Sequence, residues 1–195
     1  YPLKGLQYLI EALYYIKRRY PDVILYVPGA IIKREFTIKE YIRQRAYRKY
    51  LRSIIERYDL WDNVRFVGIL SSQEMANYMS KANVFVCSSV IENHSSTLRE
   101  AMLVGTPCIS GAVGGIPEYL INNQNGLLVD PEDDIALAGN IIKIFENDEL
   151  AMKLSLCAHE TIAHYYSQRE MTLQDIYDEV IKREESNNAE EVLRR

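Results

Sequence analysis

The chain has 195 residues, of which 48% are hydrophobic, and a formal net charge of −4. This length suffices for one domain with a substantial core, and the lack of a long apolar run argues against a membrane-spanning helix. The acidic balance argues against general nucleic-acid binding. The three cysteines, Cys87, Cys108 and Cys157, lack Cys-x-x-Cys spacing, which predicts reduced thiols and a cytoplasmic protein.

Strand-like and helix-like segments alternate along the chain. Apolar residues recur at three- and four-residue spacing from Leu6 to Ile16, which predicts a helix that stops before Pro21. The strand-like run Val23–Val27 follows, and then a helix from about 38 to 58 with Leu51, Ile54, Ile55 and Tyr58 on its inner side.

The rest of the chain repeats this alternation. Ser71 and Glu74 form a capping-box pattern, and Gly105 is placed to end a helix. Strands are predicted at 64–67, 84–87, 107–110 and 126–129, and helices at 71–79, 96–104, 133–146, 148–164 and 169–183. The order predicts an α/β, Rossmann-like domain of three α/β/α layers around a parallel sheet. We expect one domain over 1–185 and a disordered polar tail over 186–195.

The segment Lys33–Arg57 carries nine basic residues and three acidic ones. A basic surface helix is most often a solvated face, and the alternative is docking to the inner face of an anionic membrane or to a lipid-linked acceptor.

Two glutamates, Glu92 and Glu100, stand eight positions apart directly after the buried strand-like run 84–87. A strand, a small-polar turn and a helix start bring backbone N–H groups and a carboxylate to one crevice at the carboxyl ends of parallel strands. An anionic phosphate can bind at such a helix N-terminus, while Glu100 accepts hydrogen bonds from hydroxyls such as those of a ribose.

The ordered string from Glu92 through Glu100-Ala-Met to Gly114-Gly115 and 125–131 resembles the nucleotide-sugar-binding half of the retaining glycosyltransferases of family 4, or glycosyl transferases group 1. The resemblance covers about 2–166 and implies the C-terminal half of a two-domain GT-B glycosyltransferase, of the hexosyltransferase type. It implies that a nucleoside-diphosphate sugar is the donor for retaining transfer to a hydroxyl acceptor in glycan, lipid or polysaccharide biosynthesis.

The resemblance also assigns roles to individual residues. Glu92 corresponds to the catalytic glutamate beside the transferred sugar, and Glu100 to the one that binds the ribose. Lys4 corresponds to the lysine on the donor pyrophosphate. His94, Ser95, Ser96 and Thr97 replace the more common Phe-Gly-Leu-Pro, and Ser95, Ser96 and Thr97 would bind phosphate through amides and hydroxyls.

The resemblance further implies an N-terminal domain that binds the glycan or lipid-linked acceptor. We expect that domain, the first strand and its arginine to lie outside this chain, so that this chain alone turns over no substrate.

Plainer roles remain open for each residue. Glu92 can cap a turn, the Ser95–Thr97 hydroxyls can be ordinary N-caps, and Glu100 and Lys4 can be solvated surface groups. His94 can touch the donor but is more often passive in such a loop. The functional alternatives are a nucleotide-sugar epimerase or glycan phosphorylase of the same architecture, or a non-enzymatic binding module that uses the basic helix.

We expect no metal and no cofactor besides the donor substrate. The histidines do not form a zinc pattern with the cysteines, and the acidic run 130–134 is better explained as a strand end followed by a helix cap. Gly114-Gly115 is neither a dinucleotide fingerprint nor a Walker loop, and it predicts close backbone packing near the crevice.

Overall fold

The computed structural model describes residues 2–29 and 46–167. Tyr1–Ile162 form one compact unit, and a second unit begins at Ala163, of which only the end of helix α7 is described. Several predictions fall outside the described residues: the helix at 38–45, the helix at 169–183, the tail at 186–195 and much of the basic segment.

The described strands are all parallel, and they form two sheets. Strand β1 (Leu25–Pro28) pairs with β2 (Val64–Gly68) in the first sheet. The second sheet has the order β3 (Phe85–Cys87), β4 (Cys108–Gly111) and β5 (Leu127–Val129). The α/β class with parallel strands is therefore confirmed, but the sheet that the alternation predicts as continuous is interrupted between β1 and β3.

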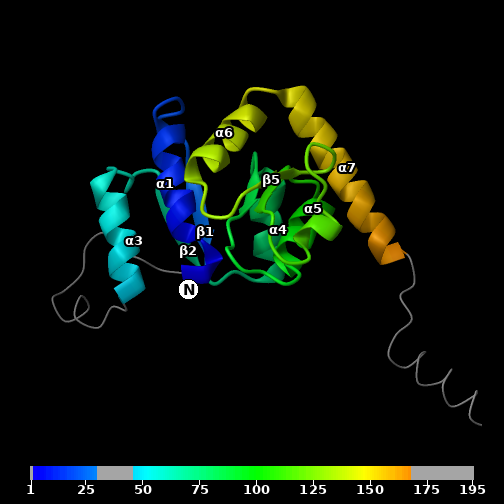
Figure 1. Cartoon of the computed structure of the whole chain (residues 1–195), viewed down its shortest axis with the longest axis horizontal. Helices are drawn as coiled ribbons and strands as arrows, with labels where there is room; N and C mark the ends of the chain where they lie inside the picture. Colours follow the sequence, from blue (N-terminus) through cyan, green and yellow to red (C-terminus); the bar gives the residue numbers. More distant parts are fainter. Residues whose placement is uncertain (1, 30–45, 168–195) are drawn as a thin grey trace, which may run out of the picture. The chain divides into compact units, whose positions relative to one another are not determined.

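Helices lie between the strands as predicted, and most of their ends agree with the predicted ends to within a few residues (Figure 1). They are α1 (Leu6–Lys17), α3 (described over Ala46–Arg57), α4 (Ser72–Lys81), α5 (Ser96–Val104), α6 (Asp134–Phe145) and α7 (Asp148–Ser167). Of two short 3-10 turns, η1 (Pro2–Lys4) was not predicted, whereas η2 (Ile116–Glu118) begins where Gly114–Glu118 predicts a sharp turn into a helix with proline at its first position. Each is a single turn, too short to produce a periodic pattern.

Local capping explains where the helices begin and end. The Ser71 side chain accepts a hydrogen bond from the Glu74 N–H while the Glu74 carboxylate accepts one from the Ser71 N–H, so the predicted capping box is confirmed. Gly105 ends α5 with a left-handed φ of 85°, a conformation that glycine adopts without steric cost.

Three apolar clusters hold the helices to the sheets. One packs α1 and α6 against β4 and β5, a second packs α4 and α5 beside β3 and β4, and a third packs α1 and α3 on β1 and β2. Helix α7 contributes Leu154 to the first cluster and Ala158 and Ile162 to the second. On α3 the predicted inner residues Leu51, Ile54 and Ile55 are buried.

Asn125 joins the turn before β5 to helix α7 through buried hydrogen bonds. Its Oδ1 accepts from the Ile121 N–H at 2.6 Å, and its Nδ2 donates to the Tyr119 carbonyl at 2.9 Å and to Thr161 Oγ1 at 3.1 Å. Asn125→Ala leaves these groups without their partner, so we expect it to lower the free energy of unfolding by about 1–3 kcal/mol. Denaturant unfolding measures this, with Asn77→Ala on the exposed side of α4 as the matched change, expected within about 0.5 kcal/mol of the parent.

Candidate active site

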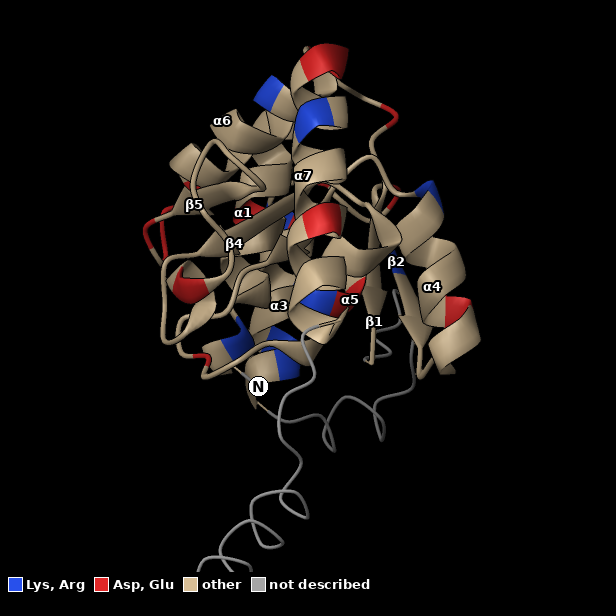
Figure 2. Ribbon diagram, turned by 90° about the vertical axis from the view of Figure 1, so that its right-hand side faces the viewer, with Lys and Arg blue, Asp and Glu red and all other residues tan. Residues whose placement is uncertain are grey.

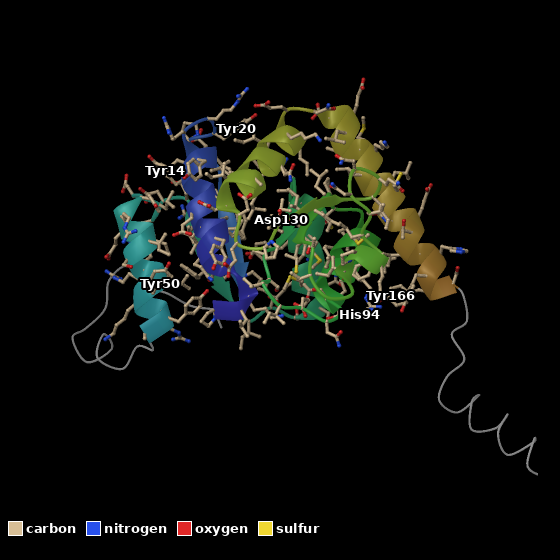
Figure 3. The ribbon with its side chains drawn as sticks, viewed as in Figure 1. Tyr14, Tyr20, Tyr50, His94, Asp130 and Tyr166 are labelled. Carbon is tan, nitrogen blue, oxygen red and sulfur yellow. The ribbon has the colours of Figure 1, made fainter. Side chains whose placement is uncertain are left out.

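The segment between β3 and α5 lies where parallel strands end, which is where open α/β sheets bind ligands. Figure 3 labels His94, a residue of this segment, near the bottom of the view. Figure 1, drawn in the same view, shows the turn before α1 at the bottom as well. Two hydrogen bonds join the turn before α1 to the segment between β3 and α5. The Val90 N–H donates to the Leu3 carbonyl at 2.9 Å, and Ser88 Oγ donates to the Lys4 carbonyl at 3.0 Å.

Lys4 and Glu92 meet at this point although 88 positions separate them in the sequence. Lys4 Nζ donates to Glu92 Oε2 at 2.6 Å, and the Ser89 hydroxyl donates to the same oxygen at 3.2 Å. The Glu92 side chain is 15% exposed and that of Lys4 is 61% exposed. The pair is thus half-buried, with the carboxylate on the protein side and the ammonium reaching into solvent.

The surroundings of Glu92 favour its charged form. Burial acts to raise the pKa of this carboxyl, but the hydrogen bond and charge of Lys4, the Ser89 hydroxyl and the Asn93 N–H outweigh burial and lower the pKa below its usual value. Glu92 is therefore an ionised carboxylate at neutral pH.

Two glycines hold the backbone of this segment from opposite sides. A Cβ on Gly5 would lie 1.7 Å from the Ser88 carbonyl oxygen, and one on Gly114 would lie 1.7 Å from the Glu92 carbonyl oxygen. Both glycines have positive φ, and the Gly115 N–H also donates to the Asn93 carbonyl at 2.9 Å. The structure therefore has the close packing predicted for Gly114-Gly115, and only glycine fits there.

The first turn of α5 carries the predicted phosphate-binding residues. Ser95 is buried, and its hydroxyl accepts a hydrogen bond from the Leu98 N–H at 3.3 Å, so this side chain is the N-cap of the helix. The N–H groups of Ser96 and Thr97, in the first helical turn, have no acceptor within the helix, and these N–H groups form the positive end of the helix dipole. Glu100 lies one turn further along with an exposed side chain.

His94 is held by neighbours of its own. Its Nε2 lies 3.5 Å from Glu118 Oε2, and its ring stacks on Tyr119 with centroids 6.3 Å apart. Burial raises the pKa of Tyr119 to about 12, so its phenol stays neutral. These contacts hold the His94 ring at the rim of the segment.

Sequence reasoning assigned no contact to Gly5 or Ser88 at this site and did not predict that Ser89 donates to Glu92. The signal that could have indicated the serines is their position directly after the strand-like run 84–87, where a strand end places small polar side chains at the crevice. Nothing local indicated Gly5, because its role depends on contact with Ser88.

Among the described residues, no group of three or more His, Cys, Asp or Glu side chains is placed to hold a metal ion. In the acidic run 130–134, Asp133 caps α6 by accepting from the Ala136 N–H at 2.8 Å. No helix in the described ranges has both the length and the apolarity to cross a membrane. Acidic and basic segments are interspersed over the described helices (Figure 2).

Comparison with known proteins identifies what this arrangement is similar to. The family model for glycosyl transferases group 1 matches residues 1–160. The amylovoran biosynthesis glycosyltransferase AmsK of Erwinia amylovora is 29% identical over 124 residues, which cover 60% of this chain and 30% of AmsK.

Two solved structures show the same fold. Sucrose-phosphate synthase from Thermosynechococcus elongatus superposes with a TM-score of 0.71 at 31% identity, over 84% of this chain and 38% of that one. HepE from Anabaena, solved in complex with UDP-glucose, gives a TM-score of 0.71 at 25% identity, over 84% of this chain and 42% of its own. The chain spans about a third of the length of the first curated relatives that it matches, at 32% and 35%.

Gly114→Ala tests the close approach to Glu92. The left-handed backbone alone costs a non-glycine residue about 1–2 kcal/mol, and the overlap with the Glu92 carbonyl adds to that cost. We expect a loss of unfolding free energy well above about 2 kcal/mol, or displacement of the 88–93 segment seen as shifted amide resonances. Gly139→Ala in α6 is the matched control, because a Cβ there meets nothing within 4 Å, and it should stabilise by about 0.5–1 kcal/mol.

Lys4→Met tests the electrostatics of Glu92. Without the ammonium, we expect the Glu92 pKa to rise, which carboxyl-carbon NMR titration measures directly. A carboxylate whose folded-state pKa is lowered stabilises the fold above its unfolded pKa, and this contribution is lost as the pH falls through the folded pKa. The variant should therefore lose less stability than the parent between about pH 6 and pH 3.

Glu74 is the internal reference in the same spectra. Its pKa is lowered by hydrogen bonds from the Ser71 backbone and hydroxyl, which Lys4 does not touch. An unchanged Glu92 pKa in Lys4→Met, or an equal change at both carboxyls, would contradict the pairing.

Proposed function

Because the chain belongs to the glycosyl transferases group 1 family, we propose that it is the donor-binding domain of a retaining glycosyltransferase of family 4. It binds a nucleoside-diphosphate sugar, and the complete enzyme transfers the sugar to a hydroxyl acceptor. The HepE complex with UDP-glucose supports this class of donor. The retaining outcome rests on the Glu92-x7-Glu100 string and on its resemblance to that family.

The observation that carries the proposal is the meeting of Lys4 with Glu92 beside the start of α5, at 2.6 Å. A lysine at the start of one helix and the N–H groups at the start of another are both positive, so together they favour an anion. Glu92 accepts a hydrogen bond from Lys4 and balances its charge. A diphosphate has two charged groups, which can engage Lys4 and the N–H groups of Ser96 and Thr97 together.

These groups also suit the chemistry of transfer. Negative charge grows on the departing diphosphate in the transition state, and the Lys4 ammonium and the N–H groups at the start of α5 stabilise that charge. In this proposal the ionised Glu92, which accepts a hydrogen bond from Lys4, contacts the transferred sugar. Protein donors thus take the role that a metal ion plays in other transferases, and we propose that no metal or further cofactor is required.

Glu100 binds the ribose in this proposal. Its side chain is exposed one turn beyond the phosphate-binding N–H groups, so a ligand can reach it without rearrangement. An ionised carboxylate that accepts two hydroxyl hydrogen bonds contributes more than a neutral acceptor. Ser95 contributes as the N-cap of α5, because it fixes the helix start whose N–H groups bind the phosphate in this proposal.

The acceptor, a glycan or lipid-linked hydroxyl, meets the donor from an N-terminal domain that this proposal places on the facing side of the cleft. The chain alone is therefore expected to bind donor without measurable transfer. We propose a cytoplasmic enzyme of polysaccharide biosynthesis that contacts the membrane peripherally.

Isothermal titration of the chain with UDP and with UDP-glucose tests donor binding. Saturable binding to the parent should weaken by about 10–100-fold in Lys4→Met and in Glu100→Gln, as expected for one charge-assisted hydrogen bond each. GDP-mannose and ADP-glucose in the same series identify the preferred base. Absence of saturable binding for every nucleotide at millimolar concentration would count decisively against the proposal.

Matched controls separate local from general charge effects. Lys153→Met and Glu149→Gln change the same chemical groups at exposed positions on α7. They should leave the affinity for UDP unchanged. Equal weakening by the control variants would mean that the site residues act only through net charge.

A further inference from the structure

The turn that carries Lys4 has no apolar anchor of its own. Turn η1 (Pro2–Lys4) has no buried residue, and Leu3, its largest apolar side chain, is 54% exposed. Burial of its side chains therefore does not fix this turn on the protein. The position of the turn depends on hydrogen bonds to its backbone.

Each of the three carbonyls of this turn accepts a hydrogen bond from another part of the chain. The Leu3 and Lys4 carbonyls accept from the segment between β3 and α5. The Pro2 carbonyl accepts from helix α1, through Gln7 Nε2 at 3.2 Å. Gln7 is thus the side chain through which α1 holds the turn.

Gln7 is a buried polar residue whose amide is oriented from helix α3. It is 8% exposed, and its Oε1 accepts a hydrogen bond from the Tyr47 hydroxyl at 2.6 Å. A side-chain amide carries its acceptor and its donors on different atoms, so the bond to Oε1 leaves Nε2 to donate to the Pro2 carbonyl. Burial raises the pKa of Tyr47, so the phenol keeps its proton and remains a donor.

The ring of Tyr47 is held by the protein core. It packs against the apolar cluster of α1, α3, β1 and β2, whose buried members on α3 are Leu51, Ile54 and Ile55. A ring held in a packed cluster gives the hydroxyl at its end a defined position. A continuous series of contacts thus runs from this cluster, through Tyr47 and Gln7, to the turn that carries Lys4.

We propose that Gln7 and Tyr47 are positioning residues for Lys4 at the donor site. Tyr47 orients the Gln7 amide, the amide holds the turn, and the turn sets where the Lys4 ammonium lies relative to Glu92 and the start of α5. A charge that is already ordered binds its ligand more tightly, because binding does not have to order it. The role in donor binding rests on the proposed function, whereas the effect on the Lys4–Glu92 pair does not.

Two substitutions test the effect on the ion pair without donor. Tyr47→Phe removes only the hydroxyl, and Gln7→Met removes the amide at similar side-chain length. Carboxyl-carbon NMR titration measures the Glu92 pKa, which burial acts to raise and the Lys4 hydrogen bond and charge lower. Both variants should raise this pKa toward, and not beyond, its value in Lys4→Met, because a less ordered ammonium pairs less with the carboxylate. Tyr14→Phe, which removes a hydroxyl from another tyrosine packed on the same cluster, should leave it unchanged.

Titration with UDP tests the effect on donor binding in a double-mutant cycle. In the parent background, Tyr47→Phe should weaken UDP binding about 3–10-fold, the scale of one hydrogen bond. In the Lys4→Met background the same change should weaken it no further, because the ammonium that Tyr47 positions is absent. A general loss of stability would weaken binding in both backgrounds alike.

The outcomes separate this proposal from the proposed function. An unchanged Glu92 pKa in Tyr47→Phe and Gln7→Met, an equal rise in Tyr14→Phe, or equal weakening of UDP binding with and without Lys4 would each overturn the positioning role. If Gln7→Met does not fold, Tyr47→Phe alone decides. Failure of the parent chain to bind any nucleotide would overturn the proposed function, and the Glu92 titration would still decide the positioning role.

Discussion

The candidate site depends on the close approach of two glycines to one loop. Gly5 lies against the Ser88 carbonyl and Gly114 against the Glu92 carbonyl, at distances that no side chain at either glycine permits. The loop backbone is thereby fixed from the α1 side and from the β4 side at once. A fixed backbone gives the Glu92 carboxylate and the start of α5 defined positions, and a site that stabilises developing charge requires such fixed groups.

The Lys4–Glu92 ion pair also joins the turn before α1 to this loop. The Glu92 side chain is 15% exposed and that of Lys4 is 61% exposed, so the carboxylate is held on the protein while the ammonium stays accessible to solvent. Lys4 donates to the Glu92 carboxylate at 2.6 Å, so the two opposite charges balance each other. Hydrogen bonds from the Ser89 hydroxyl and the Asn93 N–H also hold the Glu92 carboxylate.

The sequence by itself determined the α/β class, most helix ends, the Ser71–Glu74 capping box and the inner face of α3, because these follow from local spacing and capping chemistry. A strand end followed by a small-polar turn also predicted the start of α5, whereas the roles of Glu92 and Glu100 rest on the family resemblance and stay predictions. The ion pair of Lys4 with Glu92, the fit of Gly5 against Ser88 and the gap between β1 and β3 were decided only by the tertiary structure. Each joins segments far apart in the chain, and residue spacing carries no information on which distant backbones meet.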